Sequence, residues 1–190
     1  MSMTLRDALG RMVPCLRDEV CVHANGFLSR AAFGLRDADT CFYMIGSMGL
    51  ASSIALGIAL TRPERRVIVF DGDGNVLMNL GTLATIAVAA PPNLLHVCFD
   101  NSAHASTGAQ PTISNRVALE EIARTAGYRW AERVESPEAL DEALPGFLAR
   151  QGPAFLLVRI ALEPPGAPGP RIPWTPPEMT ARVRRAFGVA

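Results

Sequence analysis

Residues 67–108, VIVFDGDGNVLMNLGTLATIAVAAPPNLLHVCFDNSAHASTG, decide the fold of this chain. An apolar run over 67–70 leads into a polar stretch at 71–75, and a second apolar run over 94–99 leads into Asp100 and Asn101. In an open α/β sheet such strand ends lie side by side at the carboxyl edge, where ligands bind. Carboxylate and amide groups beside glycines suit a divalent ion that carries a phosphate. We therefore predict a ligand site at this edge.

The segments around this stretch alternate between strand and helix patterns. The alternation favours an α/β fold with three layers, in which a parallel sheet carries helices on both faces. The 26 residues between Gly74 and Asn101 suffice for one crossover helix and a return strand. Further strands are predicted over 20–23, 42–45, 129–134 and 155–162, and helices over 28–35, 50–60, 76–90, 117–126 and 137–149.

The composition changes after residue 162. Residues 1–162 carry the alternating pattern and are predicted to form one domain. Residues 163–190 begin with EPPGAPGPRIPWTPP, which is typical of a stiff, extended tail, and they are predicted to end in a short helix over 177–187.

Charge and residue usage exclude several classes of function. The chain has 18 basic and 18 acidic residues, a balance that argues against a nucleic-acid binder. It has no lysine, which excludes Schiff-base chemistry and a Walker-type phosphate loop within it. Without a signal peptide or an apolar stretch of about 20 residues, we expect a cytoplasmic protein without membrane contact. The four cysteines lack metal-site spacing and are expected to be buried, reduced thiols.

Three segments carry a resemblance to a known family. Gly72-Asp73-Gly74 followed by Asn101 resembles the binding motif of thiamine diphosphate-dependent enzymes. GSMGLASSIALGIAL, DGDGNVLMNLGTLATIA and DNSAHASTGAQPT are similar to the cofactor-binding domain of phosphonopyruvate and sulfopyruvate decarboxylases. The resemblance extends over roughly residues 20–162. It implies the thiamine diphosphate-binding fold, with thiamine diphosphate and Mg²⁺ as cofactors.

The resemblance also implies roles for individual residues. Asp73 and Asn101 would bind Mg²⁺ through their side chains, and Ala103 would bind it through its carbonyl oxygen. Met48 would hold the cofactor bent, and with His104 it is a candidate catalytic residue; each could also be purely structural. The full set implied to bind the cofactor is Asn25, Gly26, Gly46, Ser47, Met48, Gly72, Asp73, Gly74, Asn75, Asn101, Ala103, His104 and Ala105.

The resemblance implies only half of an active site. In these enzymes a glutamate from a pyrimidine-binding domain activates the cofactor ring, and the chain resembles the diphosphate-binding β subunit instead. The glutamate would then come from a separate α subunit in a hetero-oligomer, with β subunits paired. The substrate would be a 2-oxo acid, whose anionic head group could be read by the other subunit or by Arg30 or Arg171 of this chain. Another carboligase or lyase subunit, or a non-catalytic regulatory subunit, remains an alternative.

Other enzyme classes fit the sequence less well. VFDGDGN also matches the start of a haloacid-dehalogenase-type phosphatase, but the required downstream acidic pair is missing. A nicotinamide-binding domain would need an early G-x-G-x-x-G, which is absent. The β chains of 2-oxo acid:ferredoxin oxidoreductases share the GDG and Asn pattern, but they generally bring cluster cysteines at a spacing not found here.

Overall fold

The computed structural model describes residues 3–163 and 169–189, and its centre is a parallel sheet. Six strands lie in the order β2-β1-β3-β4-β8-β7, and every neighbouring pair is parallel. The strands are β1 (Val20–His23), β2 (Cys41–Tyr43), β3 (Val67–Gly72), β4 (Leu94–Asp100), β7 (Trp130–Val134) and β8 (Ala154–Arg159). A separate two-stranded ribbon joins β5 (Ala103–His104) to β6 (Gln110–Pro111).

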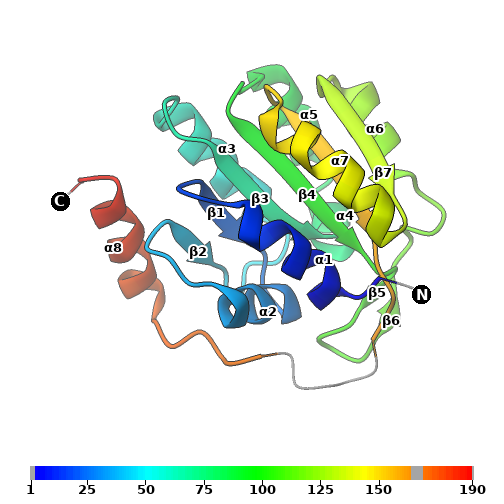
Figure 1. Cartoon of the computed structure of the whole chain (residues 1–190), viewed down its shortest axis with the longest axis horizontal. Helices are drawn as coiled ribbons and strands as arrows, with labels where there is room; N and C mark the ends of the chain where they lie inside the picture. The colour runs from blue at the N-terminus through cyan, green and yellow to red at the C-terminus, as the bar shows by residue number, and fades with distance from the viewer. Residues whose placement is uncertain (1–2, 164–168, 190) are drawn as a thin grey trace.

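Helices cover both faces of the sheet, which confirms the predicted three-layer α/β fold (Figure 1). One face carries α1 (Leu5–Met12), α2 (Phe27–Leu35) and α7 (Pro137–Ala149), and a short 3-10 turn, η1 (Val13–Cys15), follows α1. The other face carries α3 (Ala51–Thr61), α5 (Gly81–Ala89) and α6 (Leu119–Ala126). Within the described ranges, every helix is too short or too polar to span a lipid bilayer.

The strand order places the site between β1 and β3. The chain runs from β1 to β2 on one side and then returns to add β3 on the other side of β1. Ligands of open α/β sheets bind where the strand order reverses in this way. Asn25 follows β1 closely, and Asp73 follows β3 directly. The register also aligns Gly72 of β3 with Phe99 of β4, so Asn101 emerges at the same edge as Asp73.

The single helix predicted over 76–90 is wrong. The structure has two helices there, α4 (Asp73–Met78) and α5, with a break at Asn79 and Leu80. Asn79 leaves the helical conformation and donates from its side-chain amide to the carbonyl oxygen of Gly49, at 3.2 Å. The apolar sequence favours one continuous helix, but the contact between the Asn79 side chain and the distant Gly49 loop interrupts it. The strand predicted over 155–162 also ends early, at Arg159. The expectation that all four cysteines are buried is wrong for Cys15, which is exposed.

The C-terminal segment packs against the edge of the sheet. Helix α8 (Pro176–Ala186) confirms the short helix expected there and lies beside β2 (Figure 1). The Trp174 ring meets Phe33 edge to face at 5.3 Å between centroids. The Arg182 guanidinium stacks on Trp174 at 3.6 Å and pairs with Asp37 at 2.9 Å. The described part of the predicted tail is thus docked on the domain, and residues 164–168 lie outside the described residues.

Candidate functional site

A cavity of about 250 Å³ opens at the carboxyl edge of the sheet. Most of the predicted site residues line it, namely Asn25, Met48, Gly72, Asp73, Gly74, Asn75, Asn101, Ala103, His104 and Ala105. Gly26, Gly46 and Ser47 are not in its wall. Gly26 is nevertheless close to the wall, because a Cβ placed on it would lie 3.1 Å from Oγ of Ser106, which lines the cavity. The sequence therefore predicted which loops converge here.

Asp73 is a buried carboxylate at the start of α4. Its residue is only 3% exposed, and its Oδ2 accepts a hydrogen bond from the Thr112 hydroxyl. Burial raises the pKa of Asp73, the Thr112 hydroxyl lowers it, and the nearby Asp100 raises it. No ion pair compensates Asp73 within the described residues. A cation beside this carboxylate would relieve the cost of burying its charge.

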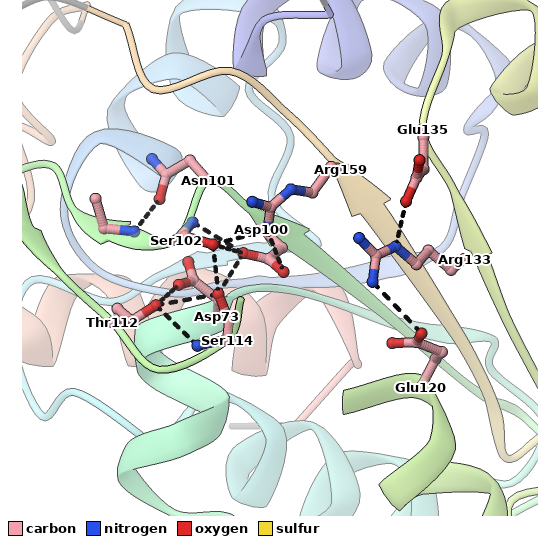
Figure 2. Close-up of polar contacts among 11 residues, drawn as sticks. Asp73, Asp100, Asn101, Ser102, Thr112, Ser114, Glu120, Arg133, Glu135 and Arg159 are labelled. Carbon is pink, nitrogen blue, oxygen red and sulfur yellow. Dashed lines mark hydrogen bonds and ion pairs between the residues drawn. The ribbon is translucent and has the colours of Figure 1, made fainter. Parts of the chain in front are cut away.

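Asp100 lies beside Asp73 but has a different environment (Figure 2). Its carboxylate accepts hydrogen bonds from the Ser102 amide at 2.9 Å and the Ser114 hydroxyl at 2.7 Å. It also pairs with the Arg159 guanidinium at 2.8 Å. The charge of Asp100 is therefore compensated by an ion pair, whereas Asp73 has no ion pair within the described residues.

The loop after β4 presents Asn101 and Ala103. The Asn101 Oδ1 accepts from the Ala103 amide at 3.0 Å, a turn in which a side-chain amide mimics backbone (Figure 2). Ser102 adopts a positive φ of 55° between them. The Thr112 amide then donates to the Ser102 carbonyl oxygen at 2.9 Å, so the β5–β6 ribbon folds back and brings Thr112 to Asp73.

Gly74 leaves room for two predicted site residues. A Cβ on Gly74 would lie 2.7 Å from ring atoms of His104 and 3.1 Å from Cε of Met48. These side chains therefore converge on the first turn of α4. Asn75 ties the same turn to the loop of Met48, because its Oδ1 accepts from the Gly49 amide at 2.9 Å. The absence of a side chain at Gly74 is thus a steric requirement of the site.

Asn25 contributes an unsatisfied polar atom. Its Oδ1 is buried and has no hydrogen-bond partner among the described residues. Buried polar atoms are normally paired, so such an exception points to a missing partner. Because Oδ1 is a hydrogen-bond acceptor, its missing partner is a donor or a cation. Asn25 and the uncompensated Asp73 carboxylate therefore fit a divalent cation such as Mg²⁺ in the cavity, which in turn carries a diphosphate.

Two other candidates take up different positions. Arg30 donates from its guanidinium to the Gly169 carbonyl oxygen at 2.6 Å, so it holds the C-terminal segment and is absent from the cavity wall. Arg171 is exposed and is also absent from the wall. Neither position supports the expectation that these arginines read a substrate head group within this chain.

Sequence reasoning missed the residues that hold the site in place. Thr112, Ser114 and Arg159 connect Asp73 and Asp100 into one polar group, which Figure 2 shows apart from the Arg133, Glu120 and Glu135 contacts. Thr112 stands in the quoted motif DNSAHASTGAQPT, but only the folded loop shows that its hydroxyl reaches Asp73.

Comparisons with known proteins agree with this geometry. The model for "Thiamine pyrophosphate enzyme, C-terminal TPP binding domain" matches residues 26–158. The chain is 44% identical to phosphonopyruvate decarboxylase of Streptomyces viridochromogenes over 95% of this chain, but over only 45% of that relative. It is 35% identical to sulfopyruvate decarboxylase subunit beta of Methanococcus maripaludis, over 98% of this chain and 99% of that subunit.

Solved structures show the same fold. The thiamine diphosphate-dependent 4-hydroxybenzoylformate decarboxylase of Rhodococcus jostii RHA1 superposes with a TM-score of 0.73 at 18% identity. The match covers 85% of this chain and 33% of that one. This chain thus spans less than half of the Streptomyces relative and a third of the Rhodococcus chain. Its sequence and fold together place it in the thiamine pyrophosphate (thiamine diphosphate) enzyme family, as a C-terminal-type cofactor-binding domain.

Proposed function

We propose that this chain binds the diphosphate half of thiamine diphosphate with Mg²⁺ and serves as the β subunit of a 2-oxo acid decarboxylase. The observation that carries the proposal is the cavity where the strand order reverses. Asp73 and Asn101 line this cavity together with Gly74, which the side chains of His104 and Met48 approach closely. The names of relatives that cover nearly all of this chain, phosphonopyruvate and sulfopyruvate decarboxylases, support the reaction class.

Each residue of the cavity would have a distinct task. Asp73 and Asn101 would hold Mg²⁺ by their side-chain oxygens, and Ala103 by its carbonyl oxygen, as befits a hard cation. Asn25, Gly26, Gly72, Gly74, Asn75 and Ala105 would surround the diphosphate. When bound, the cofactor supplies an electron sink for the loss of CO₂ from a 2-oxo acid. Met48 would support the bent cofactor, and His104 would contact the diphosphate side.

The activating glutamate is proposed to come from a separate subunit that carries the pyrimidine-binding domain. The name of the Methanococcus relative, a subunit beta matched over 99% of its length, supports this division. Exposed apolar side chains in and next to the loop of Met48 also support it. Ile45, Leu50 and Met78 are 60%, 44% and 66% exposed, and the Met78 side chain packs beside Gly49 in the loop of Met48. We propose that this patch contacts the partner subunit, with β subunits paired in the complex.

The cofactor proposal is tested by calorimetric titration of the chain with thiamine diphosphate. Binding is expected with Mg²⁺ and is expected to disappear when EDTA replaces Mg²⁺. Asp73→Ala should remove binding while circular dichroism shows an intact fold. If wild type binds no cofactor even with the partner subunit present, the cofactor site is wrong.

The reaction is tested by CO₂ release from phosphonopyruvate and sulfopyruvate, with this chain mixed with its partner subunit. Release by the mixture and not by the chain alone is expected. Equal release by the isolated chain would contradict a shared active site. Formation of a carbon–carbon coupled product would indicate a carboligase, and cofactor binding without turnover would indicate a regulatory subunit.

We also propose a cytoplasmic location, which suits the four free cysteines.

A further inference from the structure

We propose that Cys21, His23 and Cys41 form a second metal site, for a thiophilic divalent ion such as Zn²⁺, away from the cofactor cavity. One ligand atom from each of these residues lies within 4.8 Å of the others. None of the three lines the cofactor cavity. The site is independent of the proposed decarboxylase function, because it uses none of the residues assigned to the cofactor.

The sheet itself brings these ligands together. Cys21 of β1 stands in register with Cys41 of the neighbouring strand β2. His23 lies two residues after Cys21, and residues two apart in a strand point to the same face. The sulfurs and the imidazole therefore share one side of the sheet edge. No sequence motif shows this arrangement, because it depends on the pairing of two separate strands.

His23 is a buried imidazole with an unpaired ring nitrogen among the described residues. The residue is 3% exposed, and its Nδ1 is buried without a hydrogen-bond partner among the described residues. Its ring is held between the Tyr43 and Phe70 rings, at centroid distances of 4.9 and 5.0 Å. The two stacking contacts therefore fix the orientation of the ring, as is usual for a histidine that binds a metal ion.

The charge balance of the cluster suits a divalent cation. Both cysteines are free and buried, at 3% and 5% exposure. The two negative charges of a thiolate pair offset the two positive charges of a divalent ion, and the imidazole ligand is neutral, so no net charge is left in the apolar interior. Binding would release the two thiol protons to solvent.

Sulfur ligands also select against the cation of the cofactor cavity. Thiolate and imidazole favour Zn²⁺ and Co²⁺, whereas Mg²⁺ prefers oxygen ligands. The two sites should therefore load independently. A bound ion would join β1 to the three-residue edge strand β2, so it should stabilise that edge of the sheet.

The test is a Co²⁺ titration of the full chain, kept reduced and with Mg²⁺ in excess. We expect one Co²⁺ per chain with a thiolate-to-cobalt charge-transfer absorption, and its loss on addition of Zn²⁺. Zn²⁺ should also raise the thermal midpoint of unfolding. Cobalt held only by oxygen ligands at Asp73 would give no thiolate absorption, so such a spectrum would overturn the proposal.

Variants distinguish this cluster from the other thiols. Cys21→Ala and Cys41→Ala should abolish the thiolate absorption. His23→Phe keeps a ring between Tyr43 and Phe70 and should weaken Co²⁺ binding by at least about 10-fold, a loss that even outer-shell changes cause.

The controls are the two cysteines outside the cluster. Cys98→Ala is the matched buried control, and Cys15→Ser removes the exposed thiol. Both should keep the absorption and the Zn²⁺ effect on unfolding. Loss of the signal in Cys15→Ser, or its retention in both Cys21→Ala and Cys41→Ala, would refute the site. Circular dichroism of each variant shows whether the fold is retained, and His23→Phe provides the test if an alanine variant does not fold.

Discussion

The Thr112 hydroxyl donates a hydrogen bond to the Asp73 carboxylate, and so links the loop after β6 to the first turn of α4. Asp73 has no ion-pair partner within the described residues, so this hydroxyl is central to its orientation. Thr112 also donates its amide to the Ser102 carbonyl oxygen, which fixes the loop that carries Asn101. One residue thus sets the relation between the two proposed Mg²⁺ ligands.

We expect Thr112→Val to weaken binding of thiamine diphosphate with Mg²⁺. Valine keeps the shape of the side chain but removes the hydroxyl, and a hydrogen bond to a charged group contributes about 1.5–3 kcal/mol. The dissociation constant measured by calorimetry should therefore rise roughly 10- to 100-fold. Thr125→Val, at an exposed position of α6, is the matched control and should bind like wild type. Equal affinities for the two variants would exclude a role for Thr112.

Gly74→Ala should damage the site without unfolding the protein. The added Cβ would collide with the His104 ring at 2.7 Å and must displace it or Met48 from the cavity wall. Cofactor affinity should fall by about 10-fold or more, since misplaced groups lose their contacts. Gly81→Ala is the control, because nothing lies within 4 Å of its new Cβ. That variant should bind normally and be up to about 1 kcal/mol more stable to denaturant.

The strands and the convergence of the site could be predicted because they follow from local patterns. The apolar runs before Asp73 and Asn101 became β3 and β4, and the polar residues after them line one cavity. Helix α7 begins at the predicted Pro137 because Ser136 caps it and proline suits the first turn, and it also ends at the predicted Ala149. These features depend on neighbours in sequence.

The remaining features depend on contacts between distant segments. The break between α4 and α5 follows from the Asn79 contact with Gly49, which the apolar sequence of this region does not reveal. The Arg159 pairing with Asp100 joins ends of two neighbouring strands, and the Cys21 and Cys41 register joins another such pair. Predicting such contacts requires knowledge of the strand order, which a single sequence does not determine.

Asp73→Asn and Asp100→Asn should change stability in opposite directions. Burial raises the pKa of Asp73, so its ionised form destabilises the cofactor-free fold at pH values above the carboxyl's ordinary range. Removing that charge should raise the thermal midpoint of the cofactor-free protein at neutral pH and abolish Mg²⁺-dependent cofactor binding. Below the ordinary carboxyl pKa the stabilising effect should vanish, because Asp73 is then protonated in both folded and unfolded states.

Asp100 provides the contrast, because its carboxylate is paired with Arg159 and accepts from Ser102 and Ser114. Asp100→Asn should destabilise the fold by about 1–3 kcal/mol, the cost of leaving a charged partner unsatisfied. Denaturant unfolding of both variants at neutral pH tests the pair. A destabilised Asp73→Asn protein would show that Asp73 is a structural group and that its burial is already compensated.

Arg182→Lys should loosen the C-terminal helix and leave the rest of the domain intact. The Arg182 guanidinium stacks on Trp174 and bonds to Asp37 and Asp39, a planar geometry that an ammonium cannot reproduce. The cation–π stack contributes about 1–2 kcal/mol at a desolvated site. Losing it should lower the free energy of local opening of α8, so backbone hydrogen exchange in this helix should accelerate roughly tenfold. Arg185→Lys, at an exposed position of the same helix, is the control and should leave exchange unchanged. If both variants exchange alike, apolar burial of Met179 and Val183 holds the helix without Arg182.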